Sequence, residues 1–249
     1  MRKSYKNLFK LDAWNIKLIL IFLMLSTHLQ YVYNLLSPEW NRFFEIVSRG
    51  VAPMFGYLMV EGIFYTRSLK KYCLRMIIWA VIVTVGNWIL SSILIKLSPD
   101  IPIDKLIYLK IRTNITFTLV MGLLCISFVK YSQNISDRKK KIVSYLISAL
   151  TFLIGFIIEW GVVLLPFMLF TYLTKNKKNE RLIAYILIEG IAIFFRSEVY
   201  YFLVFPFIYL YNGKRGMNGA FNKYFFYFFY PFHLWSMAIV NFYILAKLQ

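Results

Sequence analysis

Long apolar segments separated by short polar breaks run along the whole chain. A membrane-spanning helix needs about 20 mostly apolar residues. The pattern predicts nine crossings, over 14–36, 43–66, 73–96, 114–131, 141–158, 160–174, 182–197, 199–211 and 224–246. The eighth is short and contains Pro206, so it can be re-entrant or tilted, which leaves eight to ten crossings open. We therefore predict an all-α, polytopic membrane helix bundle.

Composition supports one membrane domain over residues 1–249. The chain is 60% hydrophobic and 20% aromatic, and no polar stretch is long enough for a separate soluble domain. The basic N-terminus runs into the first apolar segment without a small-residue cleavage site, so no removed signal peptide is expected. Cys73 and Cys125 are isolated and match neither a metal site nor a disulfide framework. The longest outer loop, 97–113, is expected to form a lid or a short surface helix.

The net charge of +18 comes from the breaks between crossings. Most of the 29 basic residues fall in segments 1–12, 67–75, 130–141, 175–181 and 212–223, which a nine-crossing chain places on one side. Lys and Arg mark cytoplasmic loops in membrane proteins, so the N-terminus is predicted to be cytoplasmic and the C-terminus outside. The same reading explains the charge without a nucleic-acid partner.

Both histidines of the chain lie inside predicted crossings. His28 belongs to the first apolar segment and His233 to the last, at comparable depths. An ionisable ring at membrane depth is costly and usually faces a protein interior or a wet cavity. Imidazole also transfers protons near neutral pH. We expect the two rings to line one cavity, while a neutral histidine hydrogen-bonded to a neighbouring helix is the structural alternative.

Two charged residues of the second crossing are further candidates. Arg49 lies below the predicted outer face, where it could bind a carboxylate or phosphate, or reach the outer headgroups. Glu61 lies about one turn above the inner face, and Arg75 or Lys214 are its expected partners. Catalysis and structural pairing are equally open for Glu61.

The remaining candidates combine polar or cationic side chains with features that suit ligands. Glycines beside cations in the inner loops suit phosphates, although basic inner loops are expected in any case. Asn114 and Thr118 share one helix face and could line a polar cavity or bond neighbouring helices. Tyr230 continues a tyrosine stripe beside Pro231 and His233, which also fits an aromatic belt. The cationic candidates are Arg67, Arg75, Lys214 and Arg215.

Several strings resemble the TraX family of integral membrane proteins. They are VEGIFYTR followed by KKYCLR, then NITFTLVMGLL, EWGVVLL, LYNGKRG and KYFFYFFYPFHL, in order over nearly the whole chain. The resemblance implies a link to acetylation of the amino terminus of conjugative pilin, and to membrane acyltransferases that use cytoplasmic acyl-CoA. The family often has an aspartate before the first histidine, where this chain has Thr27. Adjacent helical residues do not face each other, so that aspartate would scarcely orient the imidazole.

These observations lead to a functional hypothesis, a bacterial plasma-membrane acetyltransferase that uses cytoplasmic acetyl-CoA and no metal. His28 is the expected base, and His233 would polarise the carbonyl or relay the proton. The cationic candidates would hold the CoA phosphates. The acceptor is an amine or hydroxyl of a peptide, protein N-terminus or glycan, contacted by Arg49, Asn114, Thr118 and Tyr230.

Two other classes of function stay open at this stage. Intramembrane His and Glu residues serve proton relays equally well, which would suit a proton-coupled transporter or flippase. The absence of a visible internal repeat weighs mildly against a transporter. A non-catalytic membrane partner is the weaker option, since it would have no use for costly histidines.

Overall fold

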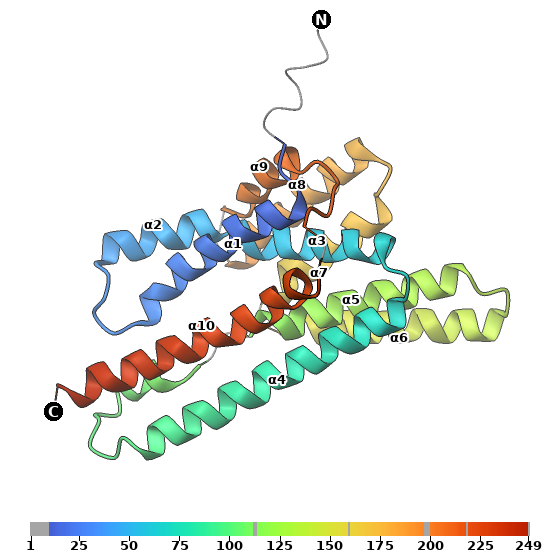
Figure 1. Ribbon diagram of the computed structural model, residues 1–249. Coiled ribbons are helices and arrows are strands. Elements are labelled where there is room, and N and C mark those ends of the chain that lie inside the picture. Colours follow the sequence, from blue (N-terminus) through green and yellow to red (C-terminus); the bar gives the residue numbers. More distant parts are fainter. Residues whose placement is uncertain (1–9, 112–113, 159, 197–199, 218, 249) are drawn as a thin grey trace, which may run out of the picture. The chain divides into compact units, whose positions relative to one another are not determined.

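A computed structural model of the chain describes residues 10–111, 114–158, 160–196, 200–217 and 219–248. In the described residues, helices are the only regular secondary structure apart from one isolated β-bridge between Leu11 and Tyr211 (Figure 1). The all-α prediction is thereby confirmed. The helices are α1 (Ala13–His28), η2 (Leu29–Tyr31), α2 (Pro38–Ser48), α3 (Val51–Tyr65), α4 (Leu69–Lys96), η3 (Leu106–Leu109), α5 (Ile115–Gln133), α6 (Arg138–Phe156), α7 (Gly161–Leu173), α8 (Lys178–Arg196), η4 (Tyr200–Leu203), α9 (Val204–Leu210) and α10 (Ala220–Ala246).

Length and composition make five helical segments of the described chain capable of crossing a membrane. They are Ala13–Tyr31, Pro38–Tyr65, Leu69–Lys96, Ile115–Gln133 and Tyr224–Ala246. The chain is therefore a multi-pass helical membrane protein. The count of nine crossings and the cytoplasmic N-terminus stay predictions. Helix α6 departs from an apolar span because four cations, from Arg138 to Lys141, open it.

The predicted second crossing is interrupted where α2 ends and α3 begins. Arg49 is the C-cap of α2, and Gly50 follows it. A Cβ at Gly50 would lie 2.6 Å from the carbonyl carbon and oxygen of Leu203, so only glycine allows the two chain segments to approach this closely. Hydrophobic periodicity gives no sign of the break, because the close contact comes from a residue far away in the sequence.

The chain divides into two compact units, and helix α4 contributes to both. Unit 1 comprises Met1–Val51, Ile82–Thr113 and Leu203–Gln249, and unit 2 comprises Ala52–Val81 and Asn114–Phe202. The expectation of a single domain over 1–249 stays a prediction. Each unit is described by itself below.

In unit 1, helices α1 and α10 run parallel. The ring of Trp14 contacts that of Phe226 near the start of both helices, with the ring centres 5.0 Å apart. Further along, the backbone N–H of Tyr33 donates to the Asn241 side chain at 2.9 Å. The contacting residues therefore follow the same order along the sequence in both helices. Two parallel spans cross a bilayer in the same direction, so an odd number of crossings is expected from the first to the last.

The described part of the loop after α4, residues 97–111, closes one end of unit 1 with the single turn η3. Leu109 of this turn is fully buried and packs with Leu94 of α4 and Leu245 of α10. The loop thus contains a short helix as expected, although its Leu109 is buried rather than at the surface, and a lid stays a prediction. Burial of its leucine anchors the loop on both long helices.

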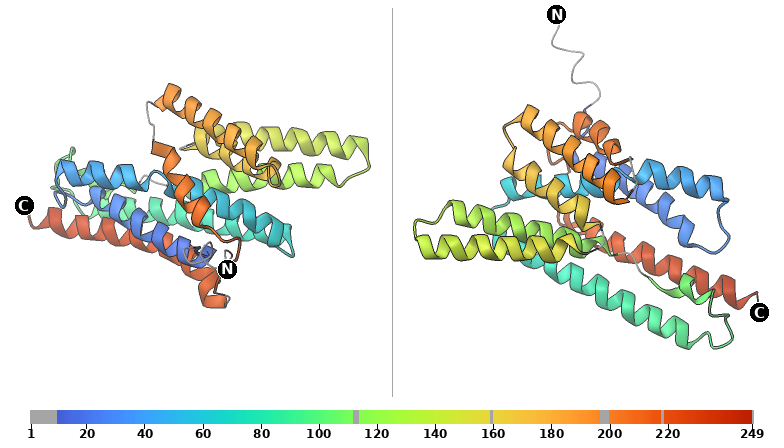
Figure 2. Two further views of the ribbon diagram at one scale, coloured as in Figure 1. Left: turned by 90° about the horizontal axis from the view of Figure 1, so that it is seen from above. Right: turned by 180° about the vertical axis from the view of Figure 1, so that it is seen from behind.

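Unit 2 is a helix bundle formed mainly by α5, α6, α7 and α8. Helix α5 packs along α6 and also against α7, which in turn packs against α8. Figure 2 shows α5 and α6 side by side over their length. Small residues allow the close packing of α5 against α7, since a Cβ at Gly122 of α5 would lie 2.7 Å from the sulfur of Met168 in α7.

Candidate functional site

His28 and His233 form a hydrogen-bonded pair inside unit 1. His28 is the last residue of α1, and His233 lies midway along α10. The distance from His28 Nδ1 to His233 Nε2 is 2.7 Å, and the ring planes differ by 8°. His233 is 4% exposed, whereas His28 is only partly buried. The prediction that the two histidines lie together is confirmed, and a shared cavity stays a prediction.

A backbone carbonyl assigns the tautomers of this pair. His233 Nδ1 lies 3.0 Å from the Phe229 carbonyl oxygen. A carbonyl can only accept, so neutral His233 carries its proton on Nδ1 and presents a lone pair at Nε2. His28 Nδ1 must then be the donor to that lone pair. The assignment leaves the lone pair of neutral His28 on Nε2.

This order of hydrogen bonds resembles the arrangement by which enzymes orient a histidine base. His28 Nε2 is the atom able to take a proton, while His233 fixes the tautomer and the ring orientation of His28. When His28 Nε2 gains a proton, the Nδ1–H bond to His233 strengthens because it becomes charge-assisted. The pair can therefore accept and return a proton without a carboxylate partner.

Aromatic rings cover the histidine pair from several directions. Phe229 stacks on His233 with the ring centres 5.3 Å apart, and Tyr230 meets the same ring edge to face at 5.5 Å. Tyr31 lies 5.6 Å from the ring centre of His28. Tyr230, expected to contact the acceptor, is buried and contacts His233 directly. An apolar cover of this kind strengthens the hydrogen bonds within it.

Thr27 makes no contribution to the orientation of His28. Its hydroxyl accepts a weak hydrogen bond from the Gln30 side-chain amide at 3.5 Å. His233 supplies the orienting contact that an acidic residue commonly supplies to a catalytic histidine. The sequence departure at Thr27 therefore leaves the hydrogen bond between His28 and His233 intact.

The loop that follows α9 is fastened to the start of α1. Leu11 donates to the Leu210 carbonyl at 2.8 Å, and Ala13 donates to the Lys214 carbonyl at 2.9 Å. Gly216 has φ +78°, and a Cβ there would lie 2.5 Å from the Asp12 carboxylate, so glycine is required. The exposed cations Lys214 and Arg215 are thereby held at the N-terminal end of α1.

Lys17, which the sequence did not single out as a site residue, lies close to this loop. It is partly buried in α1, with Nζ 5.0 Å from the centre of the Phe226 ring. Arg215 lies within electrostatic reach of it. Among the described residues, no carboxylate is within ion-pair distance of Lys17. A lysine inside an otherwise apolar segment was the available sequence signal.

The predicted phosphate ligands are divided between the two units. Lys214 and Arg215 belong to unit 1, whereas Arg67 and Arg75 belong to unit 2. Arg67 is exposed after α3, and the Arg75 guanidinium lies 5.5 Å from the centre of the Tyr72 ring. Only the first two are therefore associated with the histidine pair in one compact unit.

Glu61 has different charge partners from those expected. It is half-buried on α3 in unit 2, within electrostatic reach of Lys175 and Arg181 of the same unit, whereas Lys214 belongs to unit 1. Lys175 Nζ also lies 3.5 Å from the centre of the Phe64 ring, one turn after Glu61. The surroundings of Glu61 are those of a structural charge cluster. Its role in catalysis stays a prediction.

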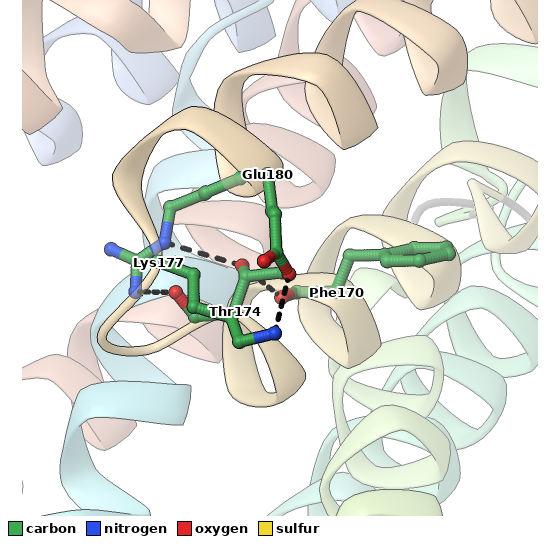
Figure 3. Close-up of polar contacts among 5 residues, drawn as sticks. Phe170, Thr174, Lys177 and Glu180 are labelled. Carbon is green, nitrogen blue, oxygen red and sulfur yellow. Dashed lines mark hydrogen bonds and ion pairs between the residues drawn. The ribbon is translucent and has the colours of Figure 1, made fainter.

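Arg181 fastens the turn between α7 and α8. It donates to the Thr174 carbonyl at 2.9 Å and to the Lys175 carbonyl at 2.6 Å, satisfying acceptors at the end of α7. Figure 3 shows the same turn, where Lys177 and Glu180 form an exposed ion pair of 2.9 Å. The cations of this break therefore have distinct structural roles.

The other predicted acceptor contacts are also divided. Arg49 forms an ion pair with Glu45 in unit 1. Asn114 accepts from the Thr116 hydroxyl at the start of α5, and Thr118 is fully buried on the same helix of unit 2. In unit 1, therefore, Arg49 and Tyr230 are the acceptor candidates that share a compact unit with the histidines.

Fold and site together define a multi-pass helical membrane protein with a hydrogen-bonded histidine pair between its first and last long helices. The TraX protein family model matches residues 13–241, and the chain belongs to this family. The chain is similar to a probable fimbrial assembly protein FimC, serogroup H1, of Dichelobacter nodosus. The two are 25% identical over 241 residues, which cover 90% of this chain and 93% of the relative. No solved structure matches the chain.

Proposed function

We propose that the protein is a plasma-membrane acetyltransferase that transfers acetyl from cytoplasmic acetyl-CoA to an amine or hydroxyl. The observation that carries this proposal is the relay from His28 Nδ1 to His233 Nε2 and from His233 Nδ1 to the Phe229 carbonyl. It leaves His28 Nε2 as an oriented base. A base within hydrogen-bond reach of the acceptor proton accelerates such reactions by about 10²–10⁴-fold.

The reaction balances without any further reagent. The acceptor nitrogen or oxygen attacks the thioester carbonyl carbon while His28 Nε2 removes the acceptor proton. The carbonyl carbon then re-forms its double bond as the bond to sulfur breaks, and the imidazolium returns the proton to the departing thiolate. The products are the acetylated acceptor and CoA with a free thiol.

The nature of the acceptor rests on the family and its relative. Because the relative from Dichelobacter nodosus is named as a probable fimbrial assembly protein, we propose the amino terminus of a pilin-like peptide as the first acceptor to test. A hydroxyl of a surface glycan is the second. Helices α1 and α10 would present the histidine pair to an acceptor held within the bilayer region.

The test uses full-length protein purified into lipid nanodiscs, with acetyl-CoA labelled in its acetyl group. Transfer of label to a peptide with a free amino terminus is expected, and the same peptide with a blocked amino terminus is the control. Label that stays on CoA with every amine and hydroxyl acceptor would overturn the proposal. Proton-coupled uptake of a solute into vesicles without acetyl-CoA would favour the transporter instead.

A further inference from the structure

We propose that Lys17 is a binding residue for the diphosphate of the acyl donor, acting with Lys214 and Arg215. This inference rests on the proposed function, because it names the part of the donor that the protein recognises. The residues lie in one compact unit together with His28.

The first argument is the convergence of cations. Lys17 lies on the first turns of α1, and the start of that helix is joined to the loop after α9 by hydrogen bonds of Leu11 and Ala13. Arg215 of that loop acts on Lys17 electrostatically, and repulsion between two cations is unfavourable without an anion between them. In the described part of the chain, the neighbouring carboxylate, Asp12, instead caps α1 by accepting from the Asn15 N–H at 2.9 Å. The structure thus holds positive charge together at a place where an anion would relieve it.

The second argument is the burial of Lys17. Its ammonium group lies 5.0 Å from the centre of the Phe226 ring, which in turn contacts Trp14, whereas Lys214 and Arg215 of the loop are exposed. A partly desolvated cation interacts more strongly with an anion than an exposed lysine does. The exposed pair can therefore attract a phosphate group, and Lys17 can hold it.

The third argument is the spacing between Lys17 and His28. The two residues are eleven positions apart in one helical segment, which corresponds to about 16 Å along the axis. About a dozen bonds join the diphosphate of CoA to its sulfur. An extended polypeptide spans roughly 3.5 Å for the three backbone bonds of each residue, so an extended chain of a dozen bonds spans roughly 14 Å. A donor whose diphosphate contacts Lys17 can therefore place its thioester close to His28.

The test compares donors with and without phosphate. Full-length protein in nanodiscs of phosphatidylcholine alone is titrated with CoA, and the Kd is measured for wild type, Lys17→Met and Lys17→Arg. Loss of a hydrogen bond between charged groups corresponds to roughly tenfold or more in Kd. We expect at least that increase for Lys17→Met, a value close to wild type for Lys17→Arg, and no change for the control Lys247→Met at the far end of α10.

Three further measurements distinguish the sources of the effect. Inorganic diphosphate should displace CoA from wild type, and S-acetylpantetheine, which lacks phosphate, should be used equally well by wild type and Lys17→Met. An unchanged Kd for CoA in Lys17→Met would overturn the inference. So would a role for Lys17 limited to phosphatidylglycerol headgroups, seen as a variant effect only in nanodiscs containing that lipid. Transfer from S-acetylpantetheine tests the proposed function separately, because it needs no phosphate contact.

Discussion

The side chain of Asn241 accepts a hydrogen bond from the backbone N–H of Tyr33 at 2.9 Å. Its amide group also donates to the carbonyls of Tyr31 and Tyr108, at 2.8 and 2.9 Å. Asn241 is 1% exposed, so this one residue satisfies three backbone groups away from solvent. It thereby fixes the chain just after His28 to the helix that carries His233.

Replacing Asn241 by leucine should destabilise unit 1 strongly. Each buried backbone group left without a partner costs about 1–3 kcal/mol, so we expect the free energy of unfolding to fall by about 2 kcal/mol or more. Thermal unfolding in detergent measures the loss as a lower Tm. Asn134→Leu, at an exposed asparagine whose side chain bonds to the Lys130 carbonyl, is the control. Equal Tm changes for the two variants would contradict the assignment.

Two glycines should respond in opposite ways to alanine. Gly50→Ala places a methyl group 2.6 Å from the Leu203 carbonyl, and overpacking of this kind costs about 1–3 kcal/mol. Gly190 lies within α8 with open space around it, so Gly190→Ala should stabilise the helix by about 0.5–1 kcal/mol. The two Tm values, measured side by side, should lie on opposite sides of wild type.

The turn between α7 and α8 should depend on Arg181 and not on Lys177. Arg181→Met removes the donors to the Thr174 and Lys175 carbonyls, and we expect a loss of about 1.5–3 kcal/mol. Lys177→Met removes an exposed ion pair, worth about 0–1 kcal/mol. Limited proteolysis of the turn and Tm measure the difference. A larger effect for Lys177→Met would refute this account of the turn.

The tautomer assignment predicts different outcomes for two replacements of His233. A glutamine carbonyl can accept from His28 Nδ1, so His233→Gln should keep a large part of the transfer rate. His233→Ala leaves the His28 ring unoriented, and a loss of about 10²-fold or more is expected. Initial rates at saturating acetyl-CoA compare the two. Equal rates in both variants would contradict the role of His233 as the orienting partner.

Sequence patterns were sufficient to locate the long apolar helices, but not to establish the number of crossings or the long-range contacts. Apolar runs located the long helices because burial in lipid requires continuous apolar segments. The break between α2 and α3 at Gly50 was not predicted, because it involves a close contact with the backbone of Leu203, which is far away in the sequence. The similar predicted depths of His28 and His233 in the membrane were enough to predict that they lie together, since residues of two spans can contact each other only at matching depth.

The charge partners were harder to predict. The basic loops predicted on which side of the membrane Glu61 lies. Every cation on that side was then an equally good candidate for its charge partner. The structure selects Lys175 and Arg181 because α3 and the turn after α7 belong to the same unit. Lys17 was not among the predicted binding residues, because a single lysine near a helix start usually reaches the headgroups.

The most direct measurement for the account is acetyl transfer by His28→Asn. The asparagine amide can occupy the position of His28 Nδ1 and donate to His233 Nε2, but it has no base in place of Nε2. We predict a folded variant with unchanged CoA affinity and a transfer rate at least about 10²-fold below wild type. A rate within about twofold of wild type would contradict the claim that His28 Nε2 removes the acceptor proton.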